Sequence, residues 1–371
     1  VDEGETGAKN WETDMDDVEH QGSAIDLEEP EKASAEVSLW VGPPTPEPEP
    51  ETAWEPPRRE PAGKTGAPWD KGGEAKGGGG VRDVVQDGKA IGASIEDELV
   101  GRVTALKAKG IEPHLAVVLA GEDAASHIYV RNKERSCKRI GIRSTRIDLP
   151  SSVGQDELMQ VIADLNADDL VHGILVQSPT PSGTDEIAIT EAIDPAKDVD
   201  GFHPMNLGRL VMGRSDGLVP CTPAGVMALL ADADIDLVGA KAVIIGRSRI
   251  VGMPLALLLA QKGIDATVTI AHSRTEDIAS ICRSADLVIA AIGRPATIKA
   301  DWIKSGATVI DVGISRVADD SRPNGTRLAG DVDPTAAEVA GHITPVPGGV
   351  GPMTIAMLMS NTVKAAEMSF D

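Results

Sequence analysis

Cysteines, aromatic residues and long apolar runs are all scarce in this 371-residue sequence. The three cysteines, Cys137, Cys221 and Cys282, show no C-x-x-C spacing and no paired histidines, so they indicate neither a disulfide framework nor a zinc site. No apolar run is long enough to cross a membrane. The first residues show neither the Arg-rich composition of a mitochondrial transit peptide nor the apolar core of a secretory signal. We therefore expect no metal, no membrane partner and a cytoplasmic location.

Basic residues are in the minority, since 35 Lys and Arg face 58 Asp and Glu. This balance argues against nucleic acid as a partner. The first 80 residues carry 20 acidic and 7 basic side chains, with prolines clustered in Pro43–Pro61 and glycines in Gly72–Gly80. Such a stretch buries too little apolar surface to offset the entropy of the chain. We predict a disordered acidic leader over residues 1–84, which is either a partner-binding arm with tryptophan anchors or a solvated extension.

After the leader, a predicted strand, tight turn and helix organise the rest of the chain. Ala242–Ile245 is a short apolar run typical of a buried parallel strand, and Pro254–Ala260 suits a helix packed on it. Between them, Gly246, Ser248 and Gly252 follow a G-x-S-x-x-x-G spacing in place of the usual G-x-G-x-x-G fingerprint. Gly246 allows a sharp turn, and Gly252 leaves the amides of the next helix open to a phosphate. The turn either binds phosphate or is an ordinary connection between strand and helix.

Upstream of this turn, one predicted helix carries a notable pair of side chains. The expected elements are a helix over Ala93–Lys109 capped by Ser94, a strand over His114–Ala120 and a helix from Ser126 to Gly141. On the last helix, Tyr129 and Lys133 are four residues apart and therefore share one face. A phenol ring beside an ammonium group suits a site that stacks a planar substrate and moves a proton, although such pairs also occur on solvated surfaces.

Two polar residues follow at positions where ligands bind in α/β proteins. Gln177 ends a predicted strand, Val171–Gln177, and ligands of open α/β sheets bind at the carboxyl ends of the strands. Asp200 lies in the segment KDVDGF, which is too polar for a core. Its carboxylate could accept two hydrogen bonds from an amino-substituted heterocycle, or it could belong to a plain turn.

Further apolar runs alternate with helical segments through the second half of the chain. This alternation predicts an α/β fold with a parallel sheet covered by helices, and the length is sufficient for two domains. The strands expected here are Val268–Ala271, Ala285–Gly293, Ala307–Ile314 and Arg327–Val332, and the last helix is expected over Thr354–Met368.

Six motifs, taken in order, resemble the family of bifunctional methylenetetrahydrofolate dehydrogenases and methenyltetrahydrofolate cyclohydrolases. The first and the last are the most specific, and the matches span nearly all of residues 85–368. The motifs are YVRNK (Tyr129–Lys133), GILVQ (Gly173–Gln177), KDVDGFHP (Lys197–Pro204), PCTPAG (Pro220–Gly225), GRSRIVGMP (Gly246–Pro254) and TPVPGGVGPMT (Thr344–Thr354).

The resemblance implies a homodimeric enzyme of one-carbon metabolism and purine biosynthesis with two α/β domains. Residues 85–220 and 350–371 would form the folate-binding catalytic domain, and residues 221–349 a Rossmann-type NADP-binding domain. The implied reactions are oxidation of 5,10-methylenetetrahydrofolate with NADP and hydrolysis of the 5,10-methenyl product to 10-formyltetrahydrofolate. Lys133 is implied to carry the proton transfers of hydrolysis, Gln177 to orient Lys133, Tyr129 to stack on the aminobenzoyl ring, and Asp200 to hold the pterin edge.

The cofactor preference is expected to be NADP. An NAD enzyme usually has Asp or Glu after the second strand of this domain, whereas Ser273 and Arg274 follow Val268–Ala271 here. Arg247 in the turn adds a second positive charge for a 2′-phosphate, as its counterpart does in the family. Ile314 ends a predicted strand on the cofactor side, where its backbone could touch nicotinamide or ribose.

Two loops complete the predicted site. The family places the loop containing Pro347, Gly348 and Gly349 near both folate and nicotinamide, where the glycines allow the backbone to lie against a ligand. The family usually has leucines where this chain has Ser178 and Thr180, while the prolines that shape the loop are kept. We expect this change to loosen the packing around Gln177 and to weaken the cyclohydrolase step more than the dehydrogenase step.

Two other classes of function remain open at this point. One is a related two-domain NADP dehydrogenase with a different small substrate, against which the combination of Tyr129, Lys133, Gln177 and Asp200 argues. The other is a noncatalytic scaffold whose acidic leader binds a partner. A scaffold is expected to have lost catalytic residues, and all of the implied ones are present.

Overall fold

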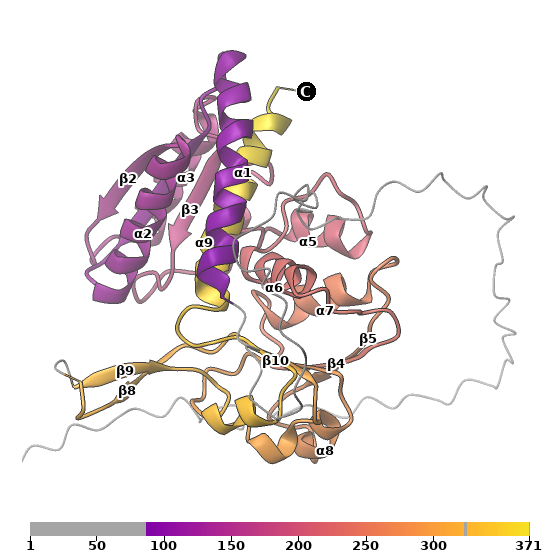
Figure 1. The fold of residues 1–371 in the computed structure, drawn as a ribbon. Coiled ribbons are helices and arrows are strands. Elements are labelled where there is room, and N and C mark those ends of the chain that lie inside the picture. The colour runs from indigo at the N-terminus through magenta and orange to yellow at the C-terminus, as the bar shows by residue number, and fades with distance from the viewer. Residues whose placement is uncertain (1–86, 323–324, 371) are drawn as a thin grey trace, which may run out of the picture. The chain divides into compact units, whose positions relative to one another are not determined.

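The computed structural model describes residues 87–322 and 325–370, in which helices and strands alternate (Figure 1). The predicted leader over residues 1–84 lies outside the described residues. The described part confirms the mixed α/β fold. Its strands form two parallel sheets and one two-stranded antiparallel ribbon.

The first sheet contains three parallel strands in the order β2-β1-β3. The central strand β1 is HLAVVLA and is buried at every position, because strands lie on both sides of it and helices cover it. Its bounds match the predicted ones. Strand β3 ends at Gln177, so this side chain lies at the carboxyl end of the sheet. The elements of this part are α1 (Gly88–Ala108), β1 (His114–Ala120), α2 (Ala124–Ile140), β2 (Arg143–Leu149), α3 (Gln155–Ala167), β3 (Gly173–Gln177), α4 (Glu186–Ala192) and α5 (Pro204–Val211).

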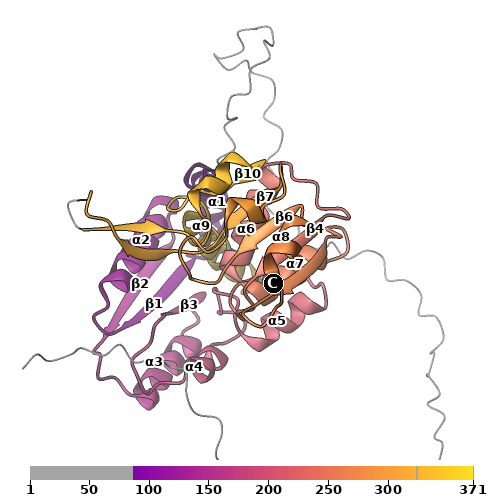
Figure 2. The same ribbon diagram turned by 90° about the horizontal axis from the view of Figure 1, so that it is seen from below.

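The second sheet contains five parallel strands in the order β10-β7-β6-β4-β5. Figure 2 shows β7, β6 and β4 as neighbours. Because β5 and β6 lie on opposite sides of β4, the strand order reverses at β4, and ligands of open sheets bind at such a reversal. The elements here are α6 (Cys221–Asp232), β4 (Lys241–Ile245), α7 (Gly252–Ala260), β5 (Thr267–Ala271), α8 (Ile278–Arg283), β6 (Leu287–Ala290), η1 (Ala300–Trp302), β7 (Thr308–Asp311), η2 (Pro334–Glu338) and β10 (His342–Ile343).

The expected strand Arg327–Val332 does not join the parallel sheet. Its first residues form β9 (Thr326–Ala329), which pairs with β8 (Ser315–Ala318) in the antiparallel ribbon. Exposed and half-buried positions alternate along β8, whereas a strand inside a covered parallel sheet is buried on both faces. The sheet edge is occupied instead by the short β10, which pairs with β7.

Helices α1 and α9 begin four or five residues earlier than the sequence predicts, and the two starts pack on each other. Helix α1 begins at Gly88, and its cap is Asp87, whose Oδ1 accepts hydrogen bonds from the amides of Lys89 (3.0 Å) and Ala90 (3.3 Å). Helix α9 (Val350–Met368) begins four residues before Thr354. A Cβ atom on Gly88 would overlap the carbonyl oxygen of Gly349, so the start of α1 packs directly on the loop before α9. Ser94 lies inside α1 and is not its cap.

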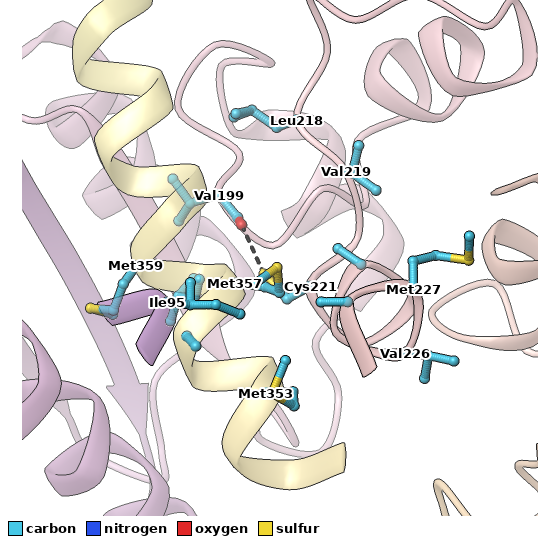
Figure 3. Packing of buried hydrophobic residues seen from close by; sticks show 14 of the residues in the cluster. Ile95, Val199, Leu218, Val219, Cys221, Val226, Met227, Met353, Met357 and Met359 are labelled. Carbon is cyan, nitrogen blue, oxygen red and sulfur yellow. Dashed lines mark hydrogen bonds between the residues drawn. The ribbon is translucent and has the colours of Figure 1, made fainter. Parts of the chain in front are cut away.

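Helix α9 connects the two parts of the core. It packs lengthwise against α1 (Figure 1) and also against α6. Figure 3 shows Met357 and Met353 of α9 on the side that faces α6, whereas Met359 points the other way, where its sulfur meets Cys137 of α2. The Cys221 thiol donates a hydrogen bond to the Val199 carbonyl (3.2 Å), and the Asn361 amide on α9 donates to the carbonyls of Val199 and Val219 (both 2.8 Å). These bonds anchor the segment that carries Asp200.

Two buried histidines lie side by side where β1 and β3 begin. The rings of His114 and His172 are both buried, and the His172 amide donates to the His114 carbonyl (3.0 Å). Nδ1 of His172 has no hydrogen-bond partner among the described residues. Burial lowers the pKa of both rings, and for His172 the charges of His114 and Lys197 lower it further.

The stability of the fold is therefore expected to decrease in mild acid. Because the pKa of each ring is lower in the folded chain than in the unfolded one, the stabilisation is complete above about pH 6.5 and is lost as the pH falls below it. Urea unfolding at pH 7.5 and 5.5 measures the loss, and His172→Gln is expected to reduce it. His342→Gln, a change of a half-buried histidine on β10, is the control. If His172→Gln lost as much stability between pH 7.5 and 5.5 as the parent does, His172 would not be a source of the pH dependence.

Candidate active site and cofactor site

A lysine and a glutamine from different elements meet at the carboxyl end of the first sheet. Lys133 lies on α2, and its Nζ donates a hydrogen bond to Oε1 of Gln177 (2.9 Å), the last residue of β3. Nε2 of Gln177 donates to the Ser178 carbonyl (2.7 Å), which turns the amide oxygen towards the lysine. The glutamine thus fixes the position of the lysine amine.

Asp200 completes this group from the loop after β3. Its backbone carbonyl accepts from the Cys221 amide (3.3 Å), and the next residue, Gly201, has φ +78° and packs tightly on the chain at Val219. Burial raises the pKa of Asp200 to about 6, and the Lys133 ammonium partly opposes the shift. Burial also lowers the pKa of Lys133, and the Asp200 charge partly opposes that shift. A lysine with a lowered pKa can accept and return a proton nearer to neutral pH.

These three residues line a cavity of about 410 Å³. This volume lies within the range of small-molecule sites. Its wall also includes Phe202 and Thr180, and from the second half of the chain Arg249 and Ile250. The sequence reasoning missed Arg249 and Ile250. Their only signal is their place in the glycine turn, two and three residues after Arg247.

The departure from the family's loop sequence has a visible consequence at the cavity wall. The Thr180 amide donates to the Glu186 carboxylate (3.1 Å), and the Thr184 hydroxyl donates to the Thr180 hydroxyl (2.7 Å). The Thr180 hydroxyl also donates to the Glu186 carboxylate (3.4 Å), so the side chain at position 180 is held by Thr184 and by the first residue of α4. The expected weakening of the cyclohydrolase step stays a prediction.

Other predicted substrate residues lie outside this cavity wall. Tyr129 is one helical turn before Lys133 and is 39 % exposed, but it is not among the lining residues. Pro347, Gly348 and Gly349 form the loop between β10 and α9 and do not line the cavity either. Gly348 has φ +114°, and the Gly349 amide donates to the Pro345 carbonyl (2.9 Å).

The glycine turn after β4 is shaped by backbone contacts. Gly246 has φ +125°, and a Cβ there would overlap the Ala291 carbonyl at the end of β6. A Cβ on Gly252 would overlap the Gly246 carbonyl, so a glycine is required here to close the turn. Oγ of Ser248 accepts from the amides of Val251 (3.2 Å) and Gly252 (3.4 Å), where α7 begins.

The other predicted cofactor residues lie at the same edge of the second sheet. Ser273 and Arg274 follow β5, Arg247 and Ser248 follow β4, and Ile314 follows β7. All five are exposed. Neither Arg247 nor Arg274 forms an ion pair with another described residue, so both guanidinium groups are available to an anion. Two guanidinium groups, a hydroxyl group and a tight glycine turn fit the phosphates of a dinucleotide.

The described residues give no sign of a metal or a membrane span. Within 87–322 and 325–370, no group of three His, Cys, Asp or Glu residues could hold a metal ion. In the same residues, no helix has the length and apolar character needed to traverse a bilayer.

Most of the chain matches known proteins in sequence. Residues 86–200 match the family model described as tetrahydrofolate dehydrogenase/cyclohydrolase, catalytic domain, and residues 220–370 match the model of the NAD(P)-binding domain of the same name. The bifunctional protein FolD of Chlorobium chlorochromatii is 55% identical over 287 residues, which are 76% of this chain and 97% of that protein.

Two solved structures are also similar to the chain. The bifunctional FolD methylenetetrahydrofolate dehydrogenase/cyclohydrolase of Campylobacter jejuni has a TM-score of 0.73 and 47% identity, covering 76% of this chain and 98% of that one. The N5,N10-methylenetetrahydrofolate dehydrogenase-cyclohydrolase of Trypanosoma brucei, complexed with NADP and an inhibitor, has a TM-score of 0.74 and 41% identity, covering 77% and 98%.

Proposed function

The chain belongs to the tetrahydrofolate dehydrogenase/cyclohydrolase family, and from this membership we propose how its residues perform the two reactions. It is an enzyme that oxidises 5,10-methylenetetrahydrofolate to the 5,10-methenyl compound with NADP⁺ and hydrolyses that product to 10-formyltetrahydrofolate. The observation that supports the assignment of roles is the hydrogen bond from Lys133 to Gln177 beside Asp200 in one cavity.

The dehydrogenase step depends on positioning. The bridging carbon of 5,10-methylenetetrahydrofolate lies between two nitrogens whose lone pairs help to expel hydride, so no strong base is needed. NADP, when bound, supplies the hydride acceptor. The residues of this chain hold the folate carbon towards the cofactor site, with Asp200 on the pterin edge and Tyr129 stacked on the aminobenzoyl ring. Pro347, Gly348 and Gly349 offer backbone surface where the two ligands meet.

The cyclohydrolase step requires proton transfer. Water adds to the methenyl carbon and loses a proton. The bond from that carbon to one nitrogen then breaks, and the departing nitrogen takes up a proton. Lys133 takes the first proton as a neutral amine and returns one as an ammonium group. Burial lowers its pKa, and the positive charge of the methenyl substrate lowers it further. Gln177 keeps the amine in place by its 2.9 Å hydrogen bond.

NADP is held at the carboxyl edge of the second sheet. Gly246, Ser248 and Gly252 form the turn for the diphosphate, while Arg247 and Arg274 face the 2′-phosphate together with Ser273. Ile314 covers the nicotinamide side. We place the catalytic domain in residues 85–220 and 350–371 and the cofactor domain in residues 221–349.

Arg274→Ala is expected to raise the KM for NADP about 10- to 100-fold, because a charge-assisted hydrogen bond contributes about 1.5–3 kcal/mol. The KM for NAD is expected to change less than threefold, since NAD has no 2′-phosphate. Steady-state kinetics with both cofactors measure the difference. Lys262→Ala, in the connection between α7 and β5, is the control for loss of a positive charge. Equal losses with NADP and NAD would contradict the role of Arg274.

A two-signal absorbance assay tests the function as a whole. Purified protein is mixed with 5,10-methylenetetrahydrofolate and either NADP or NAD, and reduced cofactor and methenyl product are followed together. Reduction with NADP and little accumulation of the methenyl compound are expected. Absence of reduction with either cofactor would refute the enzyme assignment, and a different dehydrogenase substrate would then be sought.

Two further properties belong to the proposal. The enzyme acts as a homodimer, which sedimentation equilibrium can test by giving twice the chain mass. It acts in the reducing cytoplasm, where its three free and buried cysteines would stay reduced.

A further inference from the structure

Two aspartates without an assigned role lie buried at the carboxyl edge of the second sheet. Asp311 is the last residue of β7, and Asp331 follows β9; the two residues are 4 % and 0 % exposed. No lysine, arginine or histidine of the described residues forms an ion pair with either carboxylate. A buried pair of carboxylates without a cation destabilises a fold relative to apolar side chains of the same size. A purely structural role explains such a pair poorly.

The two carboxylates bind backbone amides at the ends of two strands. Oδ2 of Asp331 accepts hydrogen bonds from the amides of Ile292 (2.7 Å) and Gly293 (3.0 Å), directly after β6. Asp311 accepts from the amides of Gly313 (3.0 Å), Asp331 (2.9 Å) and Val332 (2.9 Å). The pair therefore fixes the turn after β6 and the segment after β7 in one arrangement.

Glycines make room for both carboxylates. A Cβ on Gly313 would overlap the carboxylate of Asp331, and a Cβ on Gly330 would overlap that of Asp311. Oδ1 of Asp331 is buried and has no hydrogen-bond partner among the described residues. Only Oδ2 of Asp331 therefore holds the turn, and the second oxygen is not needed for it.

The turn that Asp331 holds also touches the glycine turn after β4. Gly246 packs against the Ala291 backbone, immediately before the two amides that Asp331 binds. In this way the carboxylate connects the end of β6 to the turn assigned to the cofactor diphosphate. Lys133 lies on α2 and Gln177 ends β3 of the first sheet, whereas Asp311 and Asp331 lie at the edge of the second sheet.

We propose that Asp331 is a positioning residue for the dehydrogenase reaction, acting through the backbone turn Ala291–Gly293 at the cofactor site. This inference rests on the proposed position of NADP. The cyclohydrolase reaction uses Lys133 and Gln177 and does not depend on Asp331. Asp331 therefore supports one of the two activities and not the other.

The test compares two substitutions at the same position. Asp331→Ala removes the acceptor and leaves two buried amides unpaired, so dehydrogenase kcat/KM is expected to fall 10- to 100-fold. Asp331→Asn keeps one carbonyl oxygen for the two amides and places its NH₂ group near Asp311, so it is expected to stay within threefold of the parent. Hydrolysis of added 5,10-methenyltetrahydrofolate without NADP is expected to stay within twofold in both variants. The rise in melting temperature caused by NADP is expected to shrink in Asp331→Ala only.

Control variants distinguish a selective role of Asp331 from a general loss of folding, and a test of the unmodified protein distinguishes it from failure of the proposed function. Asp333→Ala removes a carboxylate that caps η2 and pairs with Lys299, and it is expected to leave the ratio of the two activities unchanged. Should Asp331→Ala not fold, Gly313→Ala displaces the same carboxylate and is expected to give the same selective loss. A parallel loss of both activities, no loss, or an Asn variant as impaired as the Ala variant would each overturn the inference. Failure of the unmodified protein to reduce NADP would instead refute the proposed function.

Discussion

Replacing Lys133 by methionine is expected to lower the rate of methenyltetrahydrofolate hydrolysis about 10²- to 10⁴-fold, the usual contribution of a general acid–base group. Methionine has similar length but carries no proton, and it leaves Gln177 without its donor. The dehydrogenase reaction needs no strong base, so its kcat is expected to fall less than tenfold. The combined assay should therefore show methenyl product accumulating beside reduced NADP.

Two comparison variants distinguish proton transfer from loss of charge. Lys133→Arg keeps the positive charge but cannot release a proton at ordinary pH, so it is expected to be as defective in hydrolysis as the methionine variant. Lys138→Met changes an exposed lysine in the last turn of the same helix and is expected to keep both activities. Full hydrolysis by Lys133→Arg, or equal loss of both activities in Lys133→Met, would contradict the role of Lys133 as the proton carrier.

The sequence was sufficient for the parts of the fold that depend on local pattern. The run HLAVVLA predicts β1 with its observed bounds, because a central parallel strand is apolar throughout. The rule that ligands bind at the carboxyl ends of strands singled out Gln177, and the structure places it beside Lys133. These inferences required only spacing and residue type.

Features that depend on distant contacts could not be predicted in this way. Helix α1 begins at Gly88, whose backbone packs on Gly349, more than 250 residues away in the sequence. The ribbon of β8 and β9 depends on which partner strand is available, and hydrophobic pattern alone does not decide that. Asp331 resembles any turn aspartate in the sequence, and only the structure shows that it is buried against the amides after β6.

Gly246→Ala is expected to abolish most NADP binding, with dehydrogenase kcat/KM reduced at least 100-fold. The added Cβ would overlap the Ala291 carbonyl, so the glycine turn has to move away from the end of β6. Alanine at φ +125° also carries backbone strain of about 1–3 kcal/mol. Both effects displace the amides of Arg247 and Ser248 from the position that suits a diphosphate. Titration with NADPH fluorescence measures the loss of binding directly.

A substitution at a second glycine distinguishes the effect of the Cβ overlap from the effect of backbone strain. Gly263 has φ +95°, and a Cβ there meets no atom within 4 Å, so Gly263→Ala carries backbone strain without overlap. That variant is expected to lose some melting temperature and to bind NADPH within threefold of the parent. Gly246→Ala is expected to keep methenyltetrahydrofolate hydrolysis within about fivefold, because Lys133 and Gln177 are held by the first sheet. Equal NADPH affinity in the two variants would show that the contact between Gly246 and Ala291 does not shape the cofactor site.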